Sequence, residues 1–149
     1  MKKALKVIAV LLGLVIAFGL FSSLREPKHL YAVSGTFAAC PSRPSCVSSL
    51  ADGEVHGIAP LSFVGDPAQA QERLKKALEK IGGNTLAHEQ PGYLHALFVT
   101  PTMRYRDDLE LLIKPEGRIE MRSISRFGYR DHGVNRARVE ALRTAFNTP

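Results

Sequence analysis

Apolar residues between residues 66 and 83 recur at the spacing of one helix face. They are Ala70, Leu74, Ala77, Leu78 and Ile81. Asp66 and Pro67 suit the N-cap and first turn of a helix, and Gly82 and Gly83 suit its end. The pattern therefore predicts an amphipathic helix that begins at Pro67 and ends before Gly82.

A second helical stripe closes the sequence. Val139, Leu142, Ala145 and Phe146 share one face, and Asn135 is a residue type common at N-caps. A last helix is therefore expected to start near Asn135.

Strand patterns fill the stretch between these helices. "TLAHEQ" and "YLHALFV" flank a Pro-Gly turn, and "RYRDDLELLI" and "RIEMRSISR" flank "PEG". With Gly117 left-handed in a three-residue turn, Ile113 faces Ile119, Leu111 faces Met121 and Leu109 faces Ser123. The same register places Glu110 opposite Arg122, Leu112 opposite Glu120, Asp107 opposite Ser125, and Asp108 opposite Ile124 and diagonal to Arg122 and Arg126.

The order helix, four strands, helix predicts an α+β two-layer sandwich, with a four-stranded antiparallel sheet and two helices on one face.

The first 24 residues predict a different element. Three lysines at positions 2, 3 and 6 precede an uncharged apolar run from Val7 to Leu24, which at helical rise just crosses a bilayer core of roughly 30 Å. The expectation is a retained N-terminal transmembrane anchor with its start in the cytoplasm. A cleaved signal peptide and a lipoprotein signal are the alternatives, because "AVS" and "FAAC" are only distant matches to cleavage sites.

The expected organisation is therefore an anchor or signal over residues 1–24, a linker over 25–39 and an exported domain over 40–149. This corresponds to a single-pass bacterial inner-membrane protein whose C-terminal domain lies in the periplasm or outside the cell.

The net charge of +6 is unevenly distributed. Residues 1–39 contribute +4 and residues 40–149 contribute +2, with 15 basic and 13 acidic side chains in the latter. A nucleic-acid-binding domain would need a stronger basic excess, so nucleic acid is not an expected partner.

Cys40 and Cys46 enclose the segment "CPSRPSC". In an exported chain such a close pair predicts a disulfide, and the prolines stiffen the loop. Two free thiols are the alternative.

Arginines concentrate near the end of the second hairpin. Nine arginines and one lysine lie between residues 104 and 143, and guanidinium pairs bidentately with carboxylate or phosphate. The loop from Phe127 to Val134 joins a strand to a helix N-terminus, where backbone N–H groups can bind an anion. The residues expected to bind an anionic or polyhydroxyl ligand are Asp108, Glu110, Arg122, Ser123, Ser125, Arg126, Gly128, Tyr129, Asp131 and Asn135.

A purely structural interpretation competes with this site. Asp107, Asp108 and Glu110 can neutralise the arginines across the strands, with each exposed pair contributing roughly 0–1 kcal/mol. Catalytic evidence is weaker, because Ser48 and Ser49 lack a G-x-S-x-G context and no catalytic residues are predicted. No metal or cofactor is expected, since the spacing of His56, His88, His95 and His132 matches no ligand motif.

Several segments together resemble a bacterial family, the domain of unknown function 1499 (DUF1499). They are "CPSRPSCVSS", "GYLHALF", "DDLELLI" and "RSISRFGYRDHGVNRARVEALR". The resemblance runs from Cys40 to about Phe146, and it implies a small protein that is often anchored or exported. The motif positions that it implies are Cys40, Pro41, Pro44, Cys46, Ser48, Ser49, Asp107, Asp108, Glu110, Arg122, Ser123, Ser125, Arg126, Gly128, Tyr129, Asp131, Gly133, Asn135, Arg136 and Arg138. This sequence departs from the pattern at Ser45 and Arg130.

These observations predict a membrane-anchored periplasmic binding or accessory module. Its expected partners are the membrane, through the N-terminal helix, and an anionic small molecule or an envelope protein. An envelope hydrolase acting on an ester or phosphate, and a structural envelope protein, are the alternatives.

Overall fold

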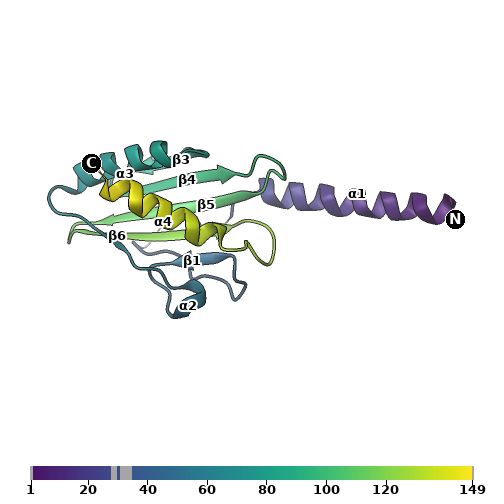
Figure 1. The fold of residues 1–149 in the computed structure, drawn as a ribbon, viewed down its shortest axis with the longest axis horizontal. Helices are drawn as coiled ribbons and strands as arrows, with labels where there is room; N and C mark the ends of the chain where they lie inside the picture. Colours follow the sequence, from purple (N-terminus) through teal and green to yellow (C-terminus); the bar gives the residue numbers. More distant parts are fainter. Residues whose placement is uncertain (1, 28–29, 31–34, 149) are drawn as a thin grey trace.

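The computed structural model of the protein describes residues 2–27, 30 and 35–148, without the side chains of residues 20, 22 and 23. Its helices and strands are shown in Figure 1. In chain order they are α1 (Lys2–Leu24), β1 (Cys46–Ser48), α2 (Gly53–His56), β2 (Leu61–Ser62), α3 (Pro67–Ile81), β3 (Asn84–Gln90), β4 (Tyr93–Val99), β5 (Arg106–Lys114), β6 (Arg118–Ser125) and α4 (Val134–Asn147).

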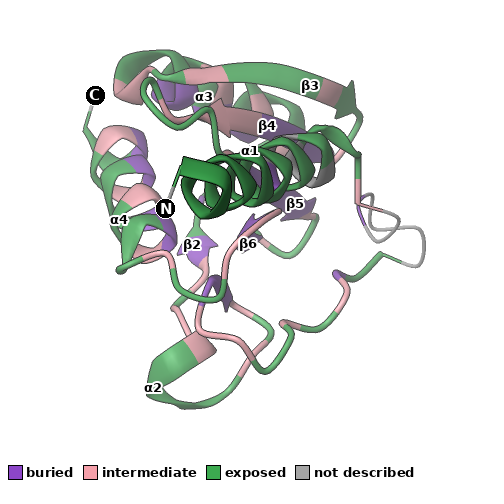
Figure 2. Cartoon of the chain, turned by 90° about the vertical axis from the view of Figure 1, so that its right-hand side faces the viewer, coloured by how far each residue is buried: buried purple, intermediate pink, exposed green. Residues whose placement is uncertain are grey.

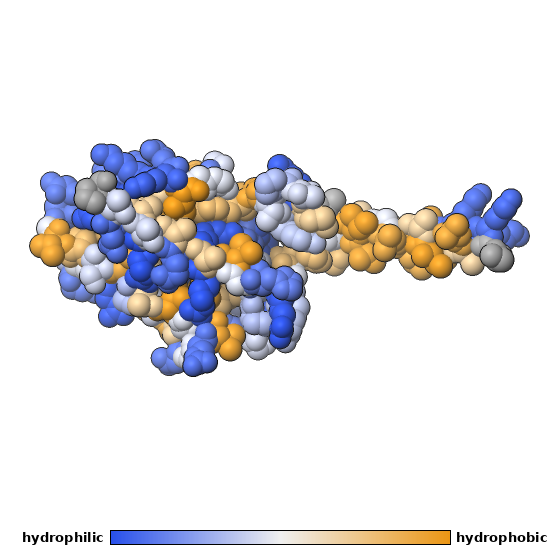
Figure 3. Space-filling view, viewed as in Figure 1, coloured by the Kyte–Doolittle hydropathy of each residue, from blue (hydrophilic) through white to orange (hydrophobic). Residues whose placement is uncertain are grey.

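The helix α1 projects away from the sheet and exposes apolar side chains along its length (Figures 1 and 3). Among the described residues, however, no helix is both long and apolar enough to cross a membrane. The prediction of an N-terminal transmembrane helix is therefore wrong, and so is the single-pass inner-membrane localisation with a periplasmic domain that depended on it.

Charged and polar residues at the two ends of α1 are the physical reason for this correction. Lysines stand at positions 2, 3 and 6, and Ser22 and Ser23 stand near the end of the helix. The apolar run between them, residues 7–21, spans about 22 Å at helical rise, which is shorter than the roughly 30 Å of a bilayer core.

The sheet is antiparallel, and its order is β1-β6-β5-β4-β3, with β2 also paired to β6. It has six strands within the described part of the chain, so the predicted four-stranded sheet is wrong. The two strands that the prediction missed, β1 and β2, have three and two residues. Such short strands show no alternation in the sequence, and they lie in a stretch rich in Gly, Pro, Ser and Asp.

The hairpin of β5 and β6 has the predicted register. Ile113 pairs with Ile119, Leu111 with Met121, Leu109 with Ser123 and Glu110 with Arg122. Gly117 adopts φ 84°, as the turn requires. A side-chain period of two makes this register specific, because a slip of one residue would turn the apolar face outward.

Both long helices of the sheet domain pack on the same face of the sheet and share one hydrophobic core (Figures 1 and 2). The predicted stripe of α3 is buried at Ala70, Leu74, Ala77 and Leu78, and the Asp66 side chain accepts a hydrogen bond from the Ala68 N–H. Leu109, Leu111, Ile119 and Met121 of the sheet meet Val139, Leu142 and Phe146 of α4. We call this side of the sheet the helix face and the opposite side the far face.

The predicted disulfide between Cys40 and Cys46 is confirmed. Residues 40–46, called the disulfide loop below, run directly into β1. Phe37, just before the loop, is buried against Tyr93 and Leu112 on the far face. The segment around the disulfide loop therefore covers part of the sheet face that α3 and α4 leave open.

Candidate functional site

The predicted site residues separate onto the two faces of the sheet. Successive side chains of a strand point to opposite faces, so Arg122 and Ser123 cannot contribute to one site. Asp108, Glu110, Arg122 and Arg126 form ion pairs on the far face, whereas Ser123, Ser125, Asp131 and Asn135 are connected on the helix face. The sequence thus predicted two networks as if they were one.

Asp108 is the centre of the far-face network. Arg126 donates to both of its carboxylate oxygens, at 2.9 and 2.7 Å, and His95 Nε2 lies 2.8 Å from Oδ1. Burial alone raises the pKa of Asp108, but the hydrogen bonds to His95 and Arg126 and the charge of Arg126 outweigh it. The pKa of Asp108 therefore lies below its ordinary value, and the carboxylate is charged at neutral pH.

Glu110 forms the second pair of the far face. Arg122 Nη1 donates to Glu110 Oε2 at 2.6 Å, and the Tyr93 hydroxyl donates to Oε1 at 2.8 Å. The Arg122 and Glu110 side chains are 5% and 1% exposed. The expectation of exposed pairs is thus wrong, because these charges are desolvated and removing one partner would leave the other buried and uncompensated.

A third arginine reaches the far face from the disulfide loop. Arg43 donates to the carbonyl oxygens of Ser125, at 2.8 Å, and Gly128, at 3.3 Å. Both acceptors are neutral, and no carboxylate among the described residues pairs with Arg43. This guanidinium therefore adds a positive charge that the other side chains of the network do not balance.

A pocket of about 260 Å³ lies between the disulfide loop and the far face, and we call it the sheet pocket. Its polar lining comes from Arg43, Asp108, Arg122, Ser125 and Arg126. Its apolar lining comes from Pro27, Ala38, Ala39, Pro41 and Ile124. Three guanidinium groups and one carboxylate thus line a single small cavity.

The hydrogen-bonding capacity of these guanidinium groups is not fully used. The Nε atoms of Arg43 and Arg122 are buried and have no acceptor among the described residues. A buried donor without an acceptor costs about 1–3 kcal/mol. The positive charge is spread over the whole guanidinium group, so an anion in the sheet pocket would offset part of this cost.

The helix-face network, by contrast, connects its arginine to side chains of three elements. Arg138 donates to Asp107 at 2.6 Å, to Asn135 at 2.6 Å and to Ser123 at 3.1 Å, and it lies 4.4 Å from the centre of the Phe98 ring. The Asn135 amide donates to Ser125, to Asp131 and to the Ser45 carbonyl. These contacts tie α4, β5 and β6 to the disulfide loop.

The N-terminus of α4 differs from the predicted anion cradle. The helix begins at Val134 with Gly133 as N-cap, so the prediction that Asn135 caps it is wrong. Asp131 accepts hydrogen bonds from the backbone N–H groups of Gly133 and Asn135. The chain's own carboxylate therefore occupies the place expected for a ligand, and Asn135 is free to join the buried network.

The two remaining predicted site residues lie beside these networks. Gly128 contributes its carbonyl oxygen to Arg43, while the Tyr129 side chain is 70% exposed. Ser49, from the motif after the disulfide loop, donates to Glu120 and accepts from the Met121 N–H. Within the part of the chain that the structure describes, no cluster of three His, Cys, Asp or Glu side chains is placed to hold a metal ion.

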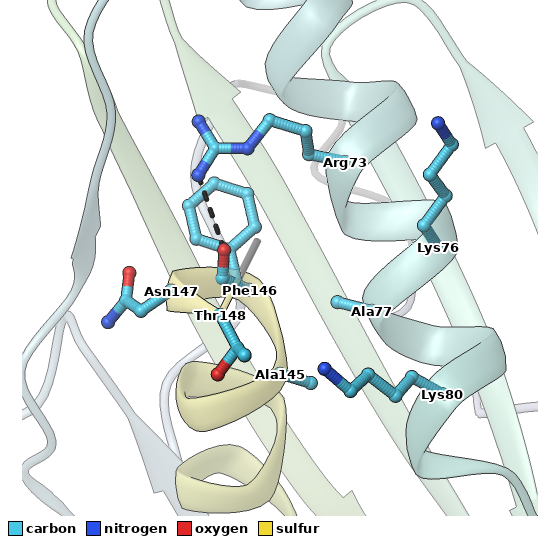
Figure 4. Close-up of a pocket in the computed structure, with 8 residues that line it drawn as sticks. All are labelled: Arg73, Lys76, Ala77, Lys80, Ala145, Phe146, Asn147 and Thr148. Atoms are coloured by element: carbon cyan, nitrogen blue, oxygen red, sulfur yellow. Dashed lines mark hydrogen bonds between the residues drawn. The ribbon is translucent and has the colours of Figure 1, made fainter.

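A larger pocket of about 540 Å³ lies between α3 and the end of α4 (Figure 4), and we call it the helix groove. Arg73 donates to the Phe146 carbonyl and lies over the Phe146 ring, which places its charge at the C-terminal end of α4. In Figure 4, Lys80 extends toward Ala145 and Lys76 points away from α4. These three cations are exposed, so they are solvated and need no ligand.

Sequence reasoning missed three residues of the far face. Arg43 lies in an irregular loop, and its contacts with Ser125 and Gly128 depend on the loop folding back over the sheet. Tyr93 and His95 are buried on β4, where they face Glu110 and Asp108. The alternation of "YLHALFV" was a usable signal, because it places both residues on the face opposite to Leu94 and Ala96.

The fold and the site define a class: a small α+β domain whose antiparallel sheet carries helices on one face and a charged pocket, closed by a disulfide loop, on the other. The profile of one family, "Protein of unknown function (DUF1499)", matches residues 36–146. The chain therefore belongs to the DUF1499 family, as its motifs suggested. Comparison with curated proteins and with solved structures gave no match.

Proposed function

We propose that the protein is a ligand-binding module that holds a small anion in the sheet pocket. One observation supports this most directly: Arg43, Arg122 and Arg126 line a cavity to which the carboxylates contribute only Asp108. Asp108 balances Arg126, and Glu110 balances Arg122. The charge of Arg43 remains for the ligand.

Burial strengthens the electrostatic interaction of the sheet pocket with an anion. The Arg122 and Arg126 side chains are 5% and 6% exposed, so water screens them poorly. Their carboxylate partners and the surrounding strands hold them in place before the ligand arrives. Affinity gains from such preorganisation, because little side-chain entropy is lost on binding.

The test is calorimetric titration of the full chain with sodium acetate and with inorganic phosphate, in a low-chloride buffer. We expect one of these anions to bind with 1:1 stoichiometry and to bind more weakly as ionic strength rises. Arg43→Gln should lower the affinity at least about tenfold, which corresponds to about 1.4 kcal/mol. Arg43 is the informative position, because its hydrogen-bond acceptors are neutral and its loss leaves no buried carboxylate unpaired.

The matched control is Arg73→Gln, which removes a guanidinium from the helix groove and should leave the affinity unchanged. Near-ultraviolet circular dichroism of both variants verifies that they are folded. Absence of binding of either anion, or an equal loss of affinity in the two variants, would overturn the proposal.

A further inference from the structure

We infer that the ligand of the sheet pocket is a monocarboxylate with a short apolar chain, an assignment that rests on the proposed function and narrows it. The inference comes from the charge, the shape and the size of the pocket, and each of these restricts the ligand separately.

The charge of the pocket favours a monoanion. Once Asp108 is paired with Arg126 and Glu110 with Arg122, one positive charge remains, on Arg43. A ligand with a second negative charge would face the Asp108 carboxylate in the same cavity, where repulsion is poorly screened. A phosphate monoester carries about −1.5 to −2 charges at neutral pH, whereas a carboxylate carries one.

The geometry of the donors favours a planar ligand group. Guanidinium and carboxylate are both planar, and two parallel N–H···O bonds join them well. Arg122 uses one nitrogen for Glu110, and its Nε–H has no acceptor among the described residues. That Nε–H is shielded from solvent, so a ligand would pair with Arg122 through Nη2, which has no acceptor among the described residues. A carboxylate offers two acceptors, one toward Arg122 and one toward Arg43, without requiring further donors.

The rest of the pocket wall is apolar. Pro27, Pro41 and Ile124 carry no polar side-chain atom, Ala38 and Ala39 are small, and the two prolines have no backbone N–H. The additional oxygens of a phosphate or sulfate would lose water against this wall without gaining hydrogen bonds. An alkyl chain would gain from the same contact.

The size of the pocket limits that chain. About 260 Å³ lies just below the roughly 300–1,000 Å³ of pockets that hold drug-sized ligands. Burying one CH₂ group is worth about a fourfold gain in affinity. Affinity should therefore rise with chain length and stop rising once the chain fills the pocket.

The experiment titrates the full chain with acetate, propionate, butyrate, hexanoate, neutral butyramide and inorganic phosphate. We expect about a fourfold gain per CH₂ from acetate to butyrate, and hexanoate locates the chain length at which the gain ends. Phosphate and butyramide should bind at least about tenfold more weakly than butyrate. Ala38→Leu, which narrows the apolar wall, should abolish the chain-length gain while acetate still binds. Ala137→Leu, on the exposed side of α4, is the matched control and should change nothing.

The outcomes separate the two proposals. Binding of phosphate in preference to every carboxylate would overturn the monocarboxylate inference but leave the anion-binding function standing. Equal affinity for acetate and butyrate, together with no change of either affinity in Ala38→Leu, would overturn the apolar part of the inference. Binding of butyramide as tightly as butyrate, or no binding of any of these probes, would overturn both.

Discussion

The two faces of the sheet use arginine differently. On the helix face, Arg138 is enclosed by Asp107, Asn135, Ser123 and the Phe98 ring. On the far face, Arg122 has one carboxylate partner, and its Nε–H, like that of Arg43, has no acceptor among the described residues. Both regions are buried and charged, so burial alone does not distinguish scaffold from site.

The distinguishing features are charge pairing and the presence of a pocket. Arg138 on the helix face is paired with the Asp107 carboxylate, so a ligand would have to break an existing ion pair to bind it. Arg43 on the far face has only neutral acceptors and lines the 260 Å³ pocket, so an anion can bind there without breaking an ion pair. The comparison predicts that substitutions on the helix face change stability and that substitutions on the pocket side change binding.

Arg138→Ala should have the largest effect. It leaves the Asp107 carboxylate, whose side chain is 6% exposed, without its ionic partner, and breaking a buried pair in this way costs about 3–5 kcal/mol. Urea unfolding followed by circular dichroism measures the loss. Arg130→Ala, at an exposed residue, is the control and should change the unfolding free energy by less than about 0.5 kcal/mol. A loss below about 1 kcal/mol for Arg138→Ala would contradict the scaffold role.

Opening the disulfide should have an intermediate effect. A six-residue separation between Cys40 and Cys46 predicts a loss of about 2 kcal/mol in unfolding free energy. Ala38, Ala39, Pro41 and Arg43 form one wall of the sheet pocket, so anion affinity should also fall at least about tenfold.

The experiment compares the oxidised protein with a Cys40→Ser/Cys46→Ser variant. Each is titrated with the same anion under conditions where the chain stays folded. Unchanged affinity in the variant would show that the disulfide loop does not shape the site.

The change with pH in the effect of Asp108→Asn should be the smallest and most specific of these effects. The loss of stability at neutral pH is itself large, because Arg126 is left buried without its carboxylate partner. The folded pKa of Asp108 is lowered, so its stabilisation is present above the unfolded value near 4 and is lost as pH falls through the folded pKa. The difference in unfolding free energy between the wild type and Asp108→Asn should therefore narrow below about pH 4. Urea unfolding at pH 7, 5, 4 and 3 measures it, and a difference that stays constant or widens toward acid would refute this assignment.

The predictable parts of the fold were the long segments with a regular alternation or helical spacing of apolar residues. The eight paired positions of β5 and β6 fixed a register that the structure confirms, because a slip would expose Leu109 and Leu111. The apolar face of α3 and its N-cap were equally predictable from the sequence. The short strands β1 and β2 were not, because two or three residues carry no period and their pairing with β6 is a long-range contact.

The site was only partly predictable for a similar reason. Strand alternation and the hairpin register predicted that Glu110 lies opposite Arg122 and that Asp108 lies diagonally across from Arg126. The position of Arg43 depends on how the disulfide loop folds back over the sheet, which no local pattern specifies. The contact of Asp131 with the start of α4 is local, because it accepts from N–H groups two and four residues along the chain, so the sequence did carry this signal. It removes the anion cradle that the glycine-containing loop had suggested.

The most direct test of the central claim observes the arginine side chains themselves. Nε–H resonances of ¹⁵N-arginine-labelled full chain, assigned through single Arg→Lys variants, are followed by nuclear magnetic resonance during titration with the tightest-binding of acetate, butyrate and phosphate. We predict saturable shifts for Arg43 and Arg122, with Arg138 and Arg73 unmoved. Shifts confined to Arg73 or Arg138, with Arg43 and Arg122 unchanged at saturation, would contradict the assignment of the far face as the binding site.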